Sequence, residues 1–215
     1  MPAIRTTVSD AAAMDEGFVY LASQSPRRAQ LLEQLGVSHR LLTAQDDEDA
    51  EALEAERTGE LPAAYVERVT RAKMSAARQR LAQSGWPIAP ILVADTTVAL
   101  GRRILGKPAD AAQAQAMLGA LAGRTHRVLT ALAVSRGAGR TAFALSTSRV
   151  HFAPVGIDQI TAYVASGEPF GKAGAYAIQG RASAWITRIE GSYTGIMGLP
   201  LHETARLLCR AGVRF

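Results

Sequence analysis

The sequence predicts a mixed α/β fold, in which helices pack on a central twisted sheet. Two observations favour this class: apolar segments of strand length alternate with amphipathic segments of helix length, and Gly or Pro separates them. The chain has 215 residues and is 48% hydrophobic, enough to bury a substantial core in one large domain or two small lobes. We expect residues 1–17 to form a flexible extension and residues 18–215 to form the folded domain.

The first predicted unit is a strand, a tight turn and a helix. The apolar run FVYLA at residues 18–22 is typical of a short buried strand. Pro26 fits the first helical position, and Ser25 before it is a favourable N-cap. The helix should cover residues 27–35, since three leucines share one side and Gly36 then ends it.

The remaining elements follow from the same periodicity and capping rules. Helices are predicted over residues 62–83, 110–121, 157–166 and 200–211, the second of them capped by Asp110. Strands are predicted over residues 91–95, 128–135, 142–151 and 184–189, and residues 98–105 should form a hairpin around Gly101. We expect the acidic stretch 45–60 to be exposed and residues 167–176 to form a Gly-rich loop.

Composition limits the class of protein. Lys and Arg exceed Asp and Glu by 24 to 19, which allows nucleic acid, anionic lipid or a phosphorylated small molecule as partner. A single cysteine, Cys209, and unpaired histidines exclude a disulfide within the chain and a His/Cys zinc site. No apolar run reaches the ~18 residues of a membrane span, and residues 1–17 do not have the pattern of a signal peptide. We therefore expect a cytoplasmic protein that makes no membrane contact.

Arg27 and Arg28 stand at the start of the first helix, where the helix dipole makes cations unfavourable. Residues that break a local rule often belong to a site. Guanidinium groups bind phosphate oxygens in a bidentate manner, and the helix N-terminus offers a second anion site. A solvated basic surface, or ion pairs with residues 45–60, is the alternative.

Asp95 is predicted at the carboxyl end of the buried strand in VADTTVAL, where open α/β sheets place ligand groups. A carboxylate there can coordinate Mg²⁺ and orient or deprotonate an attacking water. The alternative is an aspartate that caps the next turn.

Lys107 lies in GRRILGKP, which satisfies most of a nucleotide-binding P-loop. That motif needs a hydroxyl and the start of a helix after the lysine, but Pro108 provides neither, so we exclude a P-loop. Lys107 can still bind phosphate as a point charge.

Gln179 is the next-to-last residue of a Gly-rich segment, EPFGKAGAYAIQG, that also carries Glu168, Lys172 and Tyr176. Its amide presents a donor and an acceptor together, which matches the imide face of thymine or uracil. A purely structural loop is the alternative. Taken alone, Lys73 in RAKM and the acidic run 46–48 are typical of solvated side chains.

These motifs, taken in order, resemble the Maf family, also called septum formation inhibitor proteins. The resemblance runs from LASQSPRRAQLLEQLG through RAKM, VADTTV, GKP and EPFGKAGAYAIQG to IEGSYTGIMGLPL, and covers residues 18–211. It implies a two-lobed fold like that of inosine triphosphatases, with a cleft between the lobes. It also implies hydrolysis of nucleoside triphosphates to the monophosphate and pyrophosphate.

The resemblance assigns roles to individual residues. Asp95 matches the catalytic proton acceptor, and Asp95 with Glu48 would bind a divalent cation, Mg²⁺ or Mn²⁺. The residues implied to surround the triphosphate are Ser23, Ser25, Arg27, Arg28, Lys73 and Lys107. Members of the family are often dimers, so a homodimer is one assembly that the resemblance allows.

Within the family, the branch that acts on dTTP and UTP resembles this chain at Arg27, Thr96 and Gln179. The branch that acts on 7-methyl-GTP tends to have Trp, Gln and Glu there. The alternatives are the same chemistry on another canonical or modified nucleotide, or a nonenzymatic module that binds nucleic acid or a division protein. The sequence lacks a stripe of aromatic residues interleaved with basic ones, which makes nucleic acid the weaker alternative.

Overall fold

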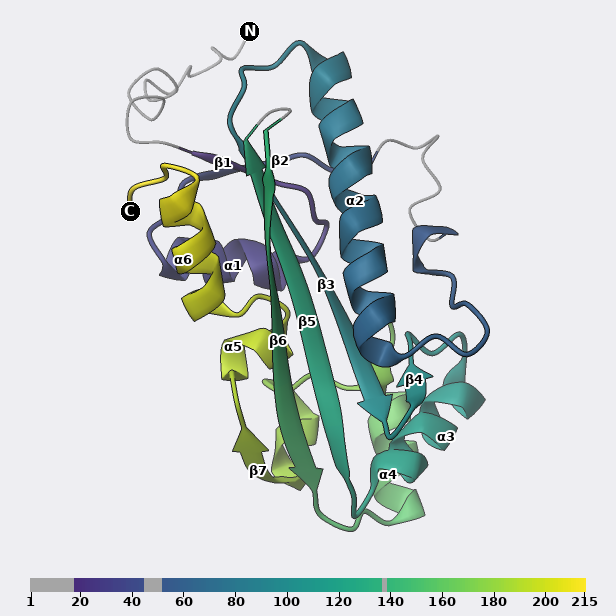
Figure 1. Cartoon of the computed structure of the whole chain (residues 1–215). Coiled ribbons are helices and arrows are strands. Elements are labelled where there is room, and N and C mark those ends of the chain that lie inside the picture. Colours follow the sequence, from purple (N-terminus) through teal and green to yellow (C-terminus); the bar gives the residue numbers. More distant parts are fainter. Residues whose placement is uncertain (1–17, 45–51, 137–138) are drawn as a thin grey trace, which may run out of the picture.

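A mixed β-sheet with long strands lies at the centre of the molecule (Figure 1). The computed structural model describes residues 18–44, 52–136 and 139–215. Its strands are β1 Val19–Leu21, β2 His39–Leu41, β3 Pro90–Leu100, β4 Arg103–Leu105, β5 Thr125–Arg136, β6 Thr141–Phe152 and β7 Ile186–Glu190. Its α-helices are α1 Pro26–Gln34, α2 Pro62–Ser84, α3 Ala111–Leu121, α4 Ile157–Ala165, α5 Tyr193–Met197 and α6 Leu201–Arg210. Short 3₁₀ helices are η1 Ala52–Glu54, η2 Ala173–Ala175 and η3 Arg181–Trp185.

The strand order is β2-β1-β3-β5-β6-β7, and β4 pairs with the end of β3. β1 pairs in parallel with β2 and with β3, whereas the other pairs are antiparallel. The predicted mixed α/β class is therefore confirmed. Among the described helices, none combines the length and the apolar character that crossing a lipid bilayer requires.

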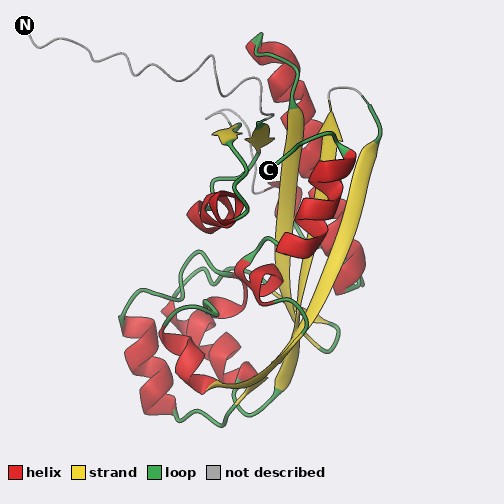
Figure 2. Ribbon diagram, turned by 90° about the vertical axis from the view of Figure 1, so that its left-hand side faces the viewer, coloured by secondary structure: helices red, strands yellow, loops and turns green. Residues whose placement is uncertain are grey.

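Different helices cover the two ends of the long strands, which gives the molecule two lobes (Figure 2). In one lobe, α1 and α6 pack on one face of the sheet and α2 packs on the other. In the other lobe, α3, α4 and the segment 175–182 enclose a separate apolar cluster. Strands β3 and β5 contribute to the cores of both lobes, so they connect the lobes.

β3 directs alternate side chains to opposite faces, as strand geometry requires. Ile91 and Val93 pack in the cluster with α2, whereas Leu92 and Ala94 pack in the cluster with α1 and α6. The next residue, Asp95, therefore belongs to the face of α2. By the same alternation Thr96 belongs to the face of α1.

One edge of β3 has a gap between its strand partners. β1 pairs with Ile91 and Leu92, and β4 begins to pair at Val98. Along residues 93–97 this edge has no strand partner in the described part of the chain, while the other edge pairs with β5 throughout. Side chains from both faces can meet around this free edge.

Most predicted elements form close to their predicted positions, with three corrections. β3 continues to Leu100, so the prediction that Asp95 ends its strand is wrong; pairing with β5 carries the strand past it. Residues 184 and 185 belong to η3, and β7 begins at Ile186. The predicted cap at Asp110 is confirmed, since its Oδ1 accepts from the Gln113 N–H at 2.7 Å. Ser25 does occupy the N-cap position of α1, but its side chain makes no capping hydrogen bond.

Candidate active site

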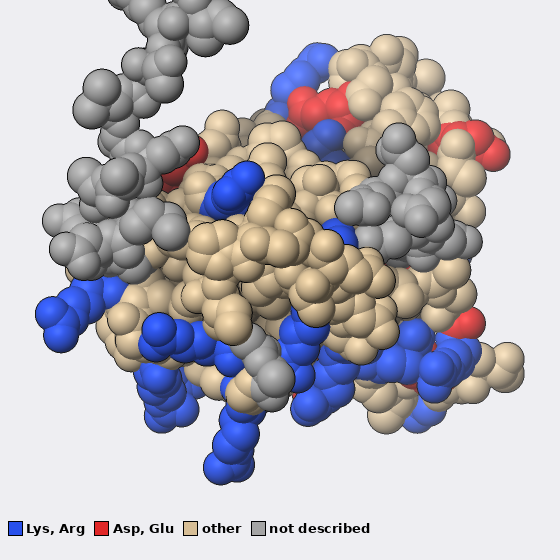
Figure 3. Space-filling model, turned by 90° about the horizontal axis from the view of Figure 1, so that it is seen from above, with Lys and Arg blue, Asp and Glu red and all other residues tan. Residues whose placement is uncertain are grey.

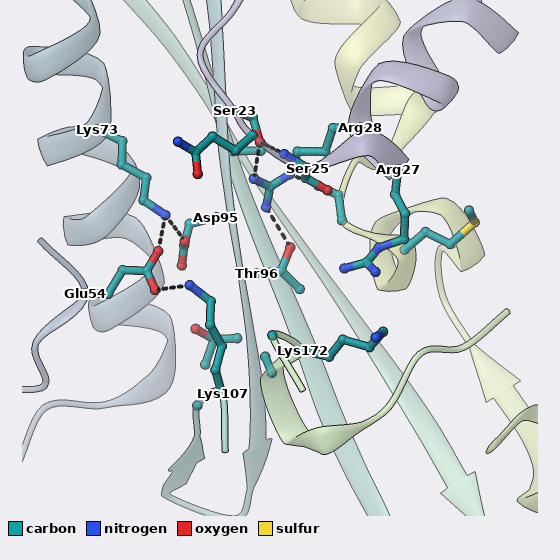
Figure 4. A pocket seen from close by; sticks show the side chains of 18 of the residues that line it. Ser23, Ser25, Arg27, Arg28, Glu54, Lys73, Asp95, Thr96, Lys107 and Lys172 are labelled. Carbon is teal, nitrogen blue, oxygen red and sulfur yellow. Dashed lines mark hydrogen bonds and ion pairs between the residues drawn. The ribbon is translucent and has the colours of Figure 1, made fainter. Parts of the chain in front are cut away.

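A cleft of about 880 Å³ lies where the two lobes meet, at the free edge of β3. The loop between β1 and α1, helix α2 and strand β3 line one part of it. The end of β4, the loop 170–179 and residues 196–198 line the rest (Figure 4). Nine predicted residues line this cleft: Ser23, Ser25, Arg27, Arg28, Lys73, Asp95, Thr96, Lys107 and Gln179. The tenth, Glu48, lies outside the described residues.

Two carboxylates and two ammonium groups form a chain on one side of the cleft (Figure 4). Lys73 Nζ lies 2.6 Å from Asp95 Oδ1 and 2.7 Å from Glu54 Oε1. Lys107 Nζ lies 2.8 Å from the other oxygen of Glu54, Oε2. Lys73 reaches Asp95 because α2 packs on the face of β3 that carries Asp95. These are charge-assisted contacts, which are stronger than neutral hydrogen bonds.

Glu54 was missed by sequence reasoning, which placed it in an exposed acidic stretch. Its side chain is 27% exposed and contacts both lysines. Burial raises the pKa of Glu54, but Lys73 and Lys107 outweigh that effect and hold the pKa below its ordinary value. The only signal in the sequence was indirect: two lysines predicted to share one site need counter-charges.

Arg28 connects three parts of the cleft wall. Its Nε donates to the carbonyl of Gly198 at 2.8 Å, and its two terminal nitrogens donate to Ser23 Oγ at 3.0 Å and Thr96 Oγ1 at 3.3 Å. Burial lowers the pKa of Arg28, and the nearby Asp95 carboxylate opposes that shift. The guanidinium thus bonds to groups of the protein within the cleft wall, and the predicted contact of Arg28 with the triphosphate stays a prediction.

Thr96 is fixed by a chain of hydroxyl groups. Thr130 Oγ1 donates to the carbonyl of Gly195 at 2.7 Å, so in its 2.9 Å contact with Thr96 the Thr96 hydroxyl is the donor. The lone pairs of Thr96 then face Arg28. This arrangement leaves each hydroxyl proton with one acceptor and links β3 and β5 to α5.

Arg27 and Lys172 provide positive charge on the other side of the cleft (Figure 4). Arg27 makes no hydrogen bond or ion pair with another described residue. Lys172 Nζ donates to the carbonyls of Glu168 and Phe170. Burial lowers the pKa of Lys172, and the charge of Arg27 lowers it further. Cations that line the same side of a cleft make that side attractive to an anion.

Gln179 lies on the wall of the cleft, exposed, in a loop that Glu168 holds in shape. Glu168 Oε1 accepts from the Tyr163 hydroxyl and from the Arg181 N–H, both at 3.0 Å. A Cβ on Gly180 would lie 1.9 Å from that oxygen, so any other residue there would force the Glu168 carboxylate to move. Gln179 is therefore presented by a fixed turn, and its amide is available to a ligand.

The donor set is compatible with a magnesium ion completed by substrate. In the described part of the chain, no group of three His, Cys, Asp or Glu side chains is placed to enclose a metal. Asp95 lines the cleft with only one of its oxygens bonded to Lys73. Mg²⁺ in nucleotide-binding sites commonly uses one or two carboxylates together with substrate phosphates, so Asp95 fits such an ion.

A second, smaller hollow of about 370 Å³ lies beside α6 at the far end of β5 and β6. Arg136, Arg140 and Arg210 line it, and its described lining contains no carboxylate. Figure 3 shows Lys and Arg side chains gathered along one side of the molecule seen from above. The hollow offers charge to an anion but no general base, in contrast to the cleft.

Comparison with known sequences decides the family. The sequence model of one family, described as Maf-like protein, matches residues 18–211. The chain belongs to the Maf family. The Maf match begins just before β1 and ends just after α6, so it includes both lobes and every described residue that lines the cleft.

Two curated relatives of this Maf chain carry the name dTTP/UTP pyrophosphatase. The protein of Polaromonas sp. (strain JS666) is 64% identical over 197 residues, which cover 92% of this chain and 97% of the relative. The protein of Burkholderia thailandensis is 64% identical over 199 residues, which cover 92% and 95%. Among solved structures, a HAM1 protein from Coxiella burnetii aligns with a TM-score of 0.45 at 17% identity, covering 91% of this chain and all of that one.

Proposed function

We propose that this Maf-family chain hydrolyses nucleoside triphosphates, dTTP and UTP foremost, to the monophosphate and pyrophosphate. One observation carries the proposal: the Asp95 carboxylate lies in a single cleft with Arg27, Lys73 and Lys107. A general base and fixed cations in one cavity are what hydrolysis of a polyphosphate requires. The names of the 64% identical relatives point to the same activity.

In the proposed reaction, the side chains that line the cleft have different roles. Lys73 holds one oxygen of Asp95, and the carboxylate accepts a proton from the attacking water. The water oxygen bonds to the α-phosphorus, and the bond from that phosphorus to the bridging oxygen breaks. Lys107, Arg27 and Lys172 line the cleft where the charge of the departing pyrophosphate develops, and cations fixed there stabilise it.

A divalent cation, Mg²⁺ or Mn²⁺, would be held by Asp95 together with substrate phosphates, and Glu48 is its second predicted ligand. When bound, such an ion polarises the α-phosphate.

We propose that the Gln179 side-chain amide forms hydrogen bonds with the imide edge of thymine or uracil. We propose that phosphate contacts Ser23, Ser25 and the N-terminus of α1.

The expected location of the protein is the cytoplasm, which agrees with the exposed free thiol of Cys209.

The competing interpretation, a nonenzymatic module that binds nucleic acid, would use the arginine-lined hollow beside α6. It gives no role to the two carboxylates and two lysines that are bonded together in the larger cleft. Steep salt dependence of nucleic-acid binding would favour it.

The test is the release of pyrophosphate from dTTP, UTP, ATP and GTP, with and without Mg²⁺. We expect dTTP and UTP to be hydrolysed fastest. Asp95→Asn should lower kcat by roughly 10²- to 10⁴-fold because the water loses its proton acceptor. Its circular dichroism should match the wild type. Near-normal turnover in Asp95→Asn would disprove the assignment, and a purine preference would place the chain in another branch.

A further inference from the structure

Glu54 occupies the lysines that the proposed substrate needs. Its two oxygens lie 2.7 Å from Lys73 Nζ and 2.8 Å from Lys107 Nζ, so one carboxylate bridges both ammonium groups. A phosphate group presents oxygens with similar charge and spacing. The Glu54 carboxylate therefore stands in the place of a phosphate between these two lysines.

The segment that carries Glu54 is anchored to α2 through its backbone. The Tyr65 hydroxyl donates to the carbonyl of Glu54 at 2.8 Å. Arg68 donates to the carbonyls of Leu53 at 3.4 Å and Ala55 at 2.9 Å.

Arg68 is itself held by Glu60, with both contacts at 2.7 Å. These hydrogen bonds fix the backbone on both sides of Glu54, so the bridge is part of the fold. Its side chain is free to move once the lysines find another partner.

We infer that Glu54 is a built-in counter-anion, displaced by the polyphosphate tail of the substrate, and that it sets how tightly the cleft binds that tail. The inference rests on the proposed function. In the absence of substrate the carboxylate keeps Lys73 beside Asp95 and neutralises Lys107. With substrate present, phosphate oxygens must compete with Glu54 for both ammonium groups.

Other roles for Glu54 predict the opposite result. If Glu54 bound the catalytic metal or assisted the attack of water, its amide variant would react more slowly and bind triphosphate no better. If Glu54 is a competitor, removing its charge frees both lysines and strengthens binding of polyphosphate. The sign of the change in affinity separates these roles.

The first experiment is calorimetric binding of inorganic tripolyphosphate to the full chain without metal. Glu54→Gln, which keeps the shape of the side chain, should bind tripolyphosphate about three- to tenfold more tightly than the wild type. The matched control is Glu56→Gln, the same change two residues along in an exposed position, which should bind like the wild type.

The second experiment is steady-state hydrolysis of dTTP. Glu54→Gln should lower KM by a similar factor, with a much smaller change in kcat. Arg68→Gln, which releases the anchored backbone, should lower KM in the same direction by less. Should Arg68→Gln fail to fold, the Glu54→Gln result alone decides.

The outcomes separate this inference from the proposed function. If dTTP is hydrolysed but Glu54→Gln binds tripolyphosphate equally or less tightly, the inference is wrong and the function stands. If no triphosphate is hydrolysed, tighter binding of tripolyphosphate by Glu54→Gln still supports the role of Glu54. Absence of tripolyphosphate binding by both proteins overturns the inference, because the lysines would then not form a polyphosphate site.

Discussion

Neighbouring arginines at the start of α1 have different environments. Arg28 points inward and donates to Ser23, Thr96 and the backbone of Gly198. Arg27 lines the cleft without a partner among the described residues. The sequence shows two equivalent arginines, and only the position of α1 over β3 distinguishes them. One guanidinium organises the cleft wall, and the other is available to a ligand.

Arg28→Lys tests this difference at the level of one residue. A lysine keeps the charge but has no planar fork, so it cannot satisfy three separated acceptors. We expect a loss of about 1–3 kcal/mol in the free energy of unfolding and a fall in kcat/KM of at least roughly tenfold. Urea unfolding and steady-state kinetics measure both.

Arg27→Lys is the matched control for that experiment. Because Arg27 has no partner to lose within the described fold, its variant should unfold like the wild type while its KM rises. Equal losses of stability in the two variants would contradict the distinction.

At the scale of elements, the loop between α4 and β7 depends on one close approach. Gly180→Ala would place a methyl group within 1.9 Å of Glu168 Oε1, so Glu168 must leave Tyr163 and the Arg181 N–H. We expect about 1–3 kcal/mol of destabilisation. Because Gln179 adjoins this turn, the ratio of kcat/KM for dTTP over GTP should also fall.

Gly119→Ala provides the control for the loop variant. Gly119 lies within α3 and has open space around an added Cβ. Alanine is the better helix former there, so this variant should gain up to about 1 kcal/mol and keep its substrate preference. Thermal melting of the two variants gives the comparison, and an unchanged melting curve for Gly180→Ala would refute the close contact.

Elements with regular periodicity were predictable from the sequence, and irregular ones were not. Both ends of the long helix α2 could be predicted from the sequence, because Pro62 marks its start and Gly85 follows its end. β2 has three residues that are partly exposed, so it carries no apolar pattern. The polar residue Asp95 predicts the end of a strand, yet pairing with β5 extends β3 beyond it.

The candidate site was predictable where residues act in compact motifs. The residues from Ser23 to Arg28 lie within six positions, and the structure brings them to the cleft with Asp95. Glu54 could not be found this way, because its partners Lys73 and Lys107 are 19 and 53 residues away in the sequence. Pairings of that kind depend on how α2 and β4 pack around β3.

At the scale of the whole molecule, a buried histidine couples stability to pH. His126 is 1% exposed, packs edge-on against Phe152 and Tyr176, and shares a 2.8 Å hydrogen bond with the Tyr176 hydroxyl. Burial, together with the nearby His151, lowers the pKa of His126 from 6.5 to about 4. The fold therefore favours the neutral ring.

The sign of the pH dependence follows from proton binding. Between pH 6.5 and 4 the unfolded chain binds a proton at His126 that the folded chain does not, so stability falls as the pH falls. The loss is on the order of 3 kcal/mol over that range. Urea unfolding at several pH values should show a shallower dependence for His126→Gln than for the wild type. His202→Gln, the same substitution at an exposed histidine, is the control for the substitution itself.

The bond from Arg28 to the carbonyl of Gly198 spans 170 positions of the chain. During synthesis, the N-terminal loop and β3 emerge long before the turn that carries Gly198. A chain in which that turn has not yet folded therefore carries Asp95 and the lysines but lacks the acceptor for Arg28 Nε. Because a contact between positions so far apart closes a long loop, this part of the cleft wall is complete only when the segments at both ends of that loop have folded.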